Sequence, residues 1–154
     1  QTASAALQLS KEADSQRLSV TELMAAIYGA SSLSDKGSAM NFDAAINAHL
    51  DWKVKLRNYL TNPDRSLDPL KVGVDNVCPL GKWLHGAGQA HRKHSDYKFL
   101  MESHADFHRC TAKVIQFAND GNTKKAENLL VPGGEFLNLS EKTVGLIQKI
   151  KSIA

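Results

Sequence analysis

Apolar side chains recur at helical spacing from Asn41 to Leu60, with polar side chains between them. The residues that share this apolar stripe are Phe42, Ala45, Ile46, His49, Leu50, Trp52, Lys53, Leu56 and Leu60. A period of 3.6 residues predicts an amphipathic helix with one buried face. Pro63 ends this helix. The pattern therefore places His49 on a buried helix face.

A second long stretch with the same period begins near Ser95 or Asp96 and runs to about Asn119, where Asp120-Gly121 ends it. Its predicted buried side consists of Phe99, Leu100, His104, Phe107, His108, Val114, Ile115 and Phe117. The two histidines in this set are four residues apart. They are therefore predicted to project from the same face, one turn apart.

Two further helices are predicted at residues 122–130 and 134–153, because Pro132-Gly133-Gly134 separates two helical stretches. No segment has the pattern of a credible strand. The predicted fold class is all-α: an antiparallel four-helix bundle with an additional short helix and an N-terminal helical extension.

Residues 63–77, between the first two long helices, lack a sustained period and predict a long connection. Pro79 then fits the first turn of a short helix that contains Gly81 to Leu84, so Cys78 stands just before its N-terminus. Backbone N–H groups and the helix dipole stabilise negative charge at such a position. This placement predicts that Cys78 favours the thiolate form.

The first part of the chain has a different pattern. Residues 1–28 carry apolar or small side chains at alternating steps of three and four, which predicts the end of a coiled-coil helix. Residues 29–37 are rich in Gly and Ser and predict a hinge. The expected domains are residues 1–38, a coiled-coil end with its hinge, and residues 39–154, the helical bundle.

Composition narrows the classes of function. The 154 residues are 42% hydrophobic, which suffices for one modest core, and their net charge is only +3. The basic residues are scattered, so no nucleic-acid partner is expected, and the densest cluster, residues 91–94, predicts a solvated loop. No apolar run reaches the roughly 18 residues of a membrane span, so no membrane contact is expected from this segment.

The chain has two cysteines, Cys78 and Cys110. Their spacing leaves a disulfide between them open. Secreted disulfide scaffolds are usually shorter and richer in cysteine, so a reducing, cytoplasmic compartment is favoured. Cys110 is expected to be a packed helix residue without a further role.

Four residues are potential metal ligands: His49, His104 and His108 on the predicted buried stripes, and Cys78 at the predicted helix cap. Zinc binds thiolate sulfur and imidazole nitrogen in tetrahedral sites, and four protein ligands leave no open position for substrate. A lone histidine on an apolar face is more often a core residue. The convergence of three such histidines with one helix-capping cysteine indicates a Zn(II) site. The other histidines, His85, His91 and His94, are expected to be exposed.

Catalysis is not expected. A zinc protease also uses two histidines four apart on a helix, but it needs a glutamate after the first, where this chain has Ala105. The chain has no Gly-rich phosphate loop, nucleophile elbow or paired-carboxylate signature. The sequence therefore predicts no catalytic residue and no organic cofactor site.

Three motifs together resemble the chemoreceptor zinc-binding family of bacterial signalling proteins. They are His49-Leu50-Asp51-Trp52-Lys53, Cys78-Pro79-Leu80-Gly81-Lys82-Trp83-Leu84 and His104-Ala105-Asp106-Phe107-His108. The resemblance extends from about residue 40 to the end and implies a zinc site with three histidines and one cysteine. It carries the ligand roles to His49, Cys78, His104 and His108. The matching residues Trp52, Gly81 and Trp83 are expected to serve packing around the site.

The resemblance also implies a helical homodimer in the cytoplasm of a bacterium. Members of the family sit at the C-terminus of methyl-accepting chemotaxis receptors, which act on a chemotaxis histidine kinase and its coupling protein, and others regulate diguanylate cyclases. The preferred hypothesis is a receptor domain that responds to zinc level or to oxidation of Cys78, for example by hypochlorous acid. The alternatives are a cyclase regulatory domain, a structural zinc module for dimerisation, and a metal-free helical interaction domain.

Overall fold

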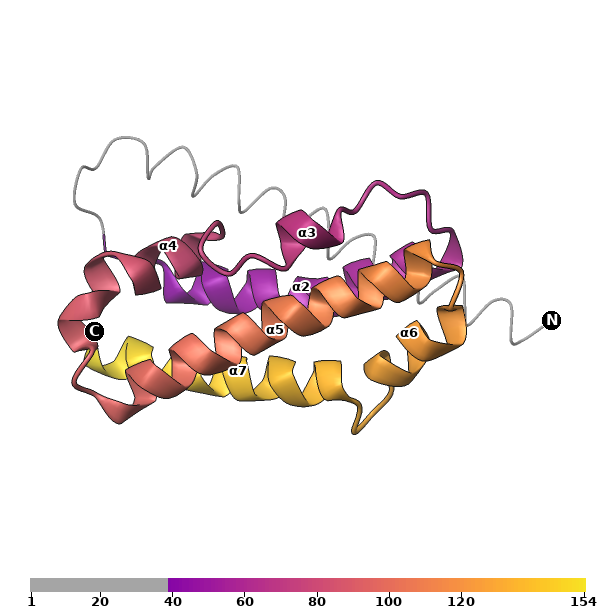
Figure 1. The fold of residues 1–154 in the computed structure, drawn as a ribbon. Helices are drawn as coiled ribbons and strands as arrows, with labels where there is room; N and C mark the ends of the chain where they lie inside the picture. The colour runs from indigo at the N-terminus through magenta and orange to yellow at the C-terminus, as the bar shows by residue number, and fades with distance from the viewer. Residues whose placement is uncertain (1–38) are drawn as a thin grey trace. The chain divides into compact units, whose positions relative to one another are not determined.

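The computed structural model describes residues 39–154, of which Met40–Ala154 form one compact unit (Figure 1). This part of the chain is helical and contains no strand, which confirms the predicted all-α class. Its main helices are α2 (Phe42–Thr61), α5 (Ser95–Asn119), α6 (Thr123–Leu130) and α7 (Glu135–Ile153). The predicted coiled coil, the hinge and the N-terminal domain fall in residues 1–38, outside the described residues.

Local sequence signals explain where the long helices begin and end. The Asn41 side chain accepts a hydrogen bond from the Ala44 N–H at 3.0 Å and caps α2. The His94 side chain accepts from the Asp96 N–H at 3.3 Å and caps α5. The predicted bounds of these two helices, and of α6 and α7, agree with the structure to within one or two residues.

The connection between α2 and α5 contains more structure than its sequence pattern predicts. It includes α3 (Pro69–Val72), the expected short helix α4 (Pro79–His85) and the 3₁₀ helix η1 (Ala87–His91). The Asp68 side chain accepts from the Leu70 N–H at 2.9 Å and caps α3, whose single turn is too short to show a period. Residues 63–77 form the long connection that the sequence predicts, and α3 is a single helical turn within it.

Interactions at the helix ends give the directions of the three long helices. The Tyr59 hydroxyl, near the end of α2, donates to Asn119 at the end of α5, with 2.5 Å between oxygens, so these helices run parallel. Lys151, near the end of α7, pairs with Asp43 at the start of α2 at 2.7 Å, so α7 runs antiparallel to both. The predicted antiparallel packing holds for α7 against α2 and α5, whereas α2 and α5 run parallel to each other because residues 62–94 return the chain to its starting end.

The core consists of two apolar clusters. One contains Leu56, Tyr59, Phe107, Cys110, Val114, Ile115, Ala118, Ala126, Leu130 and Phe136. The other contains Phe42, Ala45, Leu80, Leu84, Tyr97, Leu100, Leu146, Ile147 and Ile150. His49 on α2 and His104 on α5 stand in sequence between the residues of the two clusters and are themselves buried. The polar residues thus form a layer between two apolar halves.

Three burial predictions were wrong. Leu50 and Phe99 were placed on buried stripes but are 48% and 51% exposed. Each of these two residues is the immediate neighbour of a buried residue in its helix. One step along a helix turns the side chain by about 100°, so the neighbour of a buried residue can face the solvent. His91 was expected to be exposed, but it is half-buried and stacks on Trp83, with ring centroids 5.9 Å apart.

Two further observations concern the pairing of the cysteines and the possibility of a membrane span. Cys78 and Cys110 are both free thiols, so the disulfide left open by their spacing is not formed. Among the described helices, none combines the length and the apolar character that a membrane crossing requires.

Candidate metal centre

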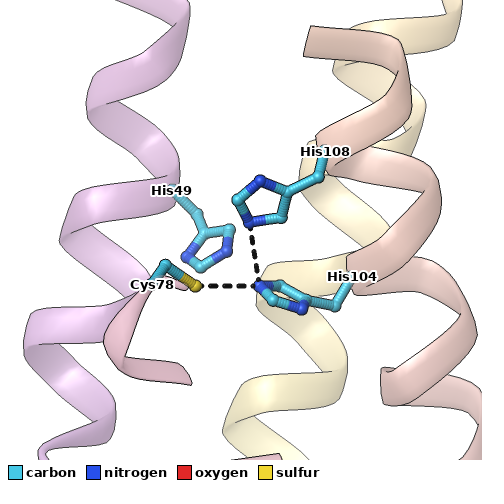
Figure 2. Close-up of side chains that lie close together, drawn as sticks. All are labelled: His49, Cys78, His104 and His108. Atoms are coloured by element: carbon cyan, nitrogen blue, oxygen red, sulfur yellow. Dashed lines mark hydrogen bonds between the residues drawn. The ribbon is translucent and has the colours of Figure 1, made fainter. Parts of the chain in front are cut away.

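Three separate segments bring four side chains together (Figure 2). His49 comes from α2, Cys78 from the cap of α4, and His104 and His108 from successive turns of α5. One ligand atom from each residue lies within 4.8 Å of the other three. Within residues 39–154, no other cluster of at least three His, Cys, Asp or Glu side chains is placed to hold a metal ion.

Two distances in this cluster are close to the edges of a tetrahedral zinc site. Cys78 Sγ lies 3.3 Å from His104 Nε2, and His104 Nε2 lies 3.2 Å from His108 Nε2 (Figure 2). A tetrahedron with Zn–N near 2.0–2.1 Å and Zn–S near 2.3 Å has edges of about 3.3 to 3.6 Å. The spacing and the donor set of three imidazoles and one thiol therefore suit a zinc ion.

Backbone carbonyls orient two of the imidazoles. Nδ1 of His49 donates to the Ala45 carbonyl at 2.6 Å, and Nδ1 of His108 donates to the Val72 carbonyl at 2.7 Å. A carbonyl oxygen only accepts, so the proton of each neutral ring sits on Nδ1 and the lone pair on Nε2. Such contacts orient metal-binding histidines and increase their basicity. The role of Val72 could not be predicted from the sequence, because Val72 contributes a backbone carbonyl and the helical period describes only side chains.

His104 is held differently. The residue is fully buried, and its Nδ1 has no hydrogen-bond partner, while its Nε2 faces both Cys78 and His108. Burial, reinforced by the neighbouring histidines, lowers the pKa of His104 to about 2. Burial also lowers the pKa of His49. The cluster therefore offers several lone pairs and few protons, which favours occupancy by a cation.

Two opposing effects act on the thiolate form of Cys78: the helix cap stabilises it and burial destabilises it. The Gly81 N–H donates to Cys78 Sγ at 3.3 Å, as the predicted helix cap requires. Burial nevertheless raises the pKa of the Cys78 thiol, and the nearby Asp75 carboxylate adds to this effect. The prediction that the cap alone favours the thiolate was wrong for the zinc-free protein, because desolvation outweighs the hydrogen bond. A metal ion has to displace the thiol proton.

The remaining candidates lie outside the cluster. His85 and His94 are exposed, as predicted, and pair with Asp75 at 3.2 Å and Asp96 at 3.7 Å. Cys110 is buried in the apolar core, as expected of a packed helix residue, and burial raises its pKa to about 12.

The fold and the cluster define a class: a helical bundle with a buried centre of three imidazoles and one thiol between its helices. Residues 49–115 match the family model of the chemoreceptor zinc-binding domain. Residues 49–115 therefore carry a domain of this family, as expected from the sequence, and the four-residue cluster is placed to bind the zinc that the family's name gives. The matched span begins at His49 and includes Cys78 and both α5 histidines. Searches of curated proteins and of solved structures gave no significant match.

The zinc-free domain is expected to lose stability as the pH falls below about 6.5. His49 and His104 have pKa values lowered by folding, so the unfolded chain binds more protons than the folded one, and stability decreases as the pH decreases. Between pH 7.5 and 5.5 we expect His104 alone to lower the free energy of unfolding by roughly 1.4 kcal/mol, and His49 to add to this loss. Urea unfolding of zinc-free protein at the two pH values measures this. A His104→Leu variant should show a smaller loss.

Proposed function

We propose that this chain is a regulatory domain in which His49, Cys78, His104 and His108 hold one zinc ion. The observation that carries the assignment is the convergence of their ligand atoms, all within 4.8 Å of one another, from three segments of the fold. Two carbonyl contacts, at 2.6 and 2.7 Å, support the orientation of the histidine ligands.

Four protein ligands suit a role in holding or sensing zinc rather than in catalysis. Zinc held by these four residues would supply a positive charge that joins the three segments, and four protein ligands would leave no open position for a substrate. The apolar clusters on both sides exclude water from the imidazoles. Loss of the ion would leave buried polar groups without a shared partner, so metal occupancy is coupled to the packing of α2, α4 and α5.

Cys78 is the element of the site that responds to a signal. It is half-buried, whereas the three histidines are at most 5% exposed, so reagents reach the sulfur first. Its sulfur would attack the chlorine of hypochlorous acid, forming an S–Cl bond as hydroxide leaves. Water would then replace chloride, giving sulfenic acid, chloride and a proton. Sulfenic acid lacks the thiolate charge and binds zinc weakly. A fall in free zinc would empty the same site by mass action.

The wider context is part of the same proposal. The helix pattern of residues 1–28 supports attachment to the signalling coiled coil of a bacterial chemoreceptor in the cytoplasm. In that setting the domain would act as a homodimer and alter the coiled-coil helix that the sequence predicts for residues 1–28. The change would then reach the chemotaxis histidine kinase and its coupling protein.

An oxidant titration tests the proposed switch. Zinc-loaded protein treated with one to a few equivalents of hypochlorous acid should release about one zinc per chain to a chromogenic chelator, as Cys78 is oxidised. The matched control is Cys110→Ser, which removes the other thiol and should release zinc like the unchanged protein. Mass spectrometry that finds Cys78 oxidised while zinc stays bound would contradict the redox role and leave zinc level or structural support as the function.

A further inference from the structure

The α3–α4 loop, residues 73–78, is a second support of the metal centre. It ends in Cys78, and it follows directly on Val72, whose carbonyl accepts the 2.7 Å hydrogen bond from His108. The same short segment thus supplies one sulfur and orients one imidazole. His49 and His104, by contrast, stand on long helices packed into the core. Whatever holds this loop in place therefore controls two of the four groups.

Helix α4 contacts the α3–α4 loop at both ends of the helix. At the start, the Gly81 N–H donates to Cys78 Sγ at 3.3 Å. At the end, His85 Nε2 lies 3.2 Å from the Asp75 carboxylate. The Asp75 backbone also packs directly on Gly81, where a Cβ would stand 1.7 Å from the Asp75 carbonyl oxygen. Asp75 is thus fixed through its carbonyl and through its carboxylate.

We propose that Asp75 and His85 are a positioning pair that ties the α3–α4 loop to α4 and holds Cys78 at the metal centre. The two residues are ten apart in sequence, so their contact joins the loop to the far end of the helix that Cys78 caps. Neither residue belongs to the four-residue cluster. This inference rests on the proposed role of Cys78 as a zinc ligand.

The structure offers a matched control pair. His94 and Asp96 lie 3.7 Å apart and have side-chain exposures of 44% and 25%, close to the 42% and 28% of His85 and Asp75. The control pair is two residues apart at the start of one helix, so it ties no loop to another element. Exposure and residue types are alike in the two pairs. The control pair is longer, at 3.7 Å against 3.2 Å, and His94 also caps α5, but neither residue of the control pair touches the segment that carries Cys78.

The test measures the rate at which zinc-loaded full chain loses zinc to an excess of a chromogenic chelator. His85→Ala is expected to release zinc about two- to five-fold faster, the range that an exposed ion pair of ordinary strength can produce. His85→Gln keeps a donor near the position of Nε2 and should restore most of the slow release. His94→Ala should leave the rate unchanged. Zinc-free His85→Ala should also react faster at Cys78 with a thiol reagent, with the modified residue identified by mass spectrometry.

A double-variant cycle separates the pair from independent effects of its members. If the two side chains act through each other, Asp75→Ala combined with His85→Ala should release zinc no faster than the faster single variant. Equal rates for His85→Ala and the unchanged protein would overturn the positioning role. A wrong ligand set would give a different result. The Cys78→Ala variant would then keep its full zinc content, whatever the rate of zinc release from His85→Ala.

Discussion

Gly81→Ala is expected to weaken zinc binding by at least about tenfold, although Gly81 offers no side chain to the metal. A Cβ there would stand 1.7 Å from the Asp75 carbonyl oxygen and 2.8 Å from its carbonyl carbon. Both atoms are backbone, so the loop has to move, and Cys78 moves with it. Overpacking of this kind also destabilises a fold by about 1 to 3 kcal/mol. Chelator competition measures the affinity, and thermal unfolding of the zinc-free protein measures the stability.

Gly145→Ala is the control for this substitution. Gly145 lies within α7, and a Cβ there meets nothing within 4 Å. Because alanine is the better helix former, this variant should gain about 0.5 to 1 kcal/mol and bind zinc normally. Unchanged zinc affinity in Gly81→Ala would show that the close approach of Asp75 does not position Cys78.

Several features of the site could be predicted because they depend on local periodicity. His49, His104 and His108 fall on helix stripes that bury one face, and Pro79 marks the start of the short helix that Cys78 caps. The helical period and the proline are local properties of the chain. The helices and the burial of these histidines could therefore be inferred from the amino-acid order, whereas the grouping of the four ligands followed from the resemblance of the three motifs to a known family.

Other features depend on tertiary contacts that no local pattern contains. The raised pKa of the Cys78 thiol follows from how deeply the folded chain buries it, and the helix cap alone predicts the opposite direction. The support of His108 comes from the backbone of Val72, in a single helical turn without a readable period. The parallel course of α2 and α5 follows from the length of their connection, which the helix pattern does not specify.

His104→Leu is expected to separate zinc binding from folding, with effects of opposite sign. The variant should lose more than about 100-fold in zinc affinity, because only three of the four donors remain. The zinc-free variant should nevertheless be about 1 kcal/mol more stable than the zinc-free protein. Leucine would remove the buried, unpaired Nδ1 of His104, and this gain is expected to exceed the loss of the Nε2 contacts with Cys78 and His108.

Denaturant unfolding at fixed free-zinc concentrations checks both effects. In the roughly 100-fold range of zinc above its dissociation constant, stability of the unchanged protein should rise by about 1.4 kcal/mol for each tenfold increase in zinc, whereas His104→Leu should show no such slope in that range. Leu100, one turn earlier on α5, is also fully buried and provides the control. Leu100→Ala should lose about 2 to 5 kcal/mol of stability and keep the dependence on zinc.

The same dependence on zinc in His104→Leu would mean that the other three donors suffice to bind the ion. If zinc-free His104→Leu is instead less stable than the zinc-free protein, the His104 imidazole stabilises the fold without metal. The site would then support folding rather than the release of zinc.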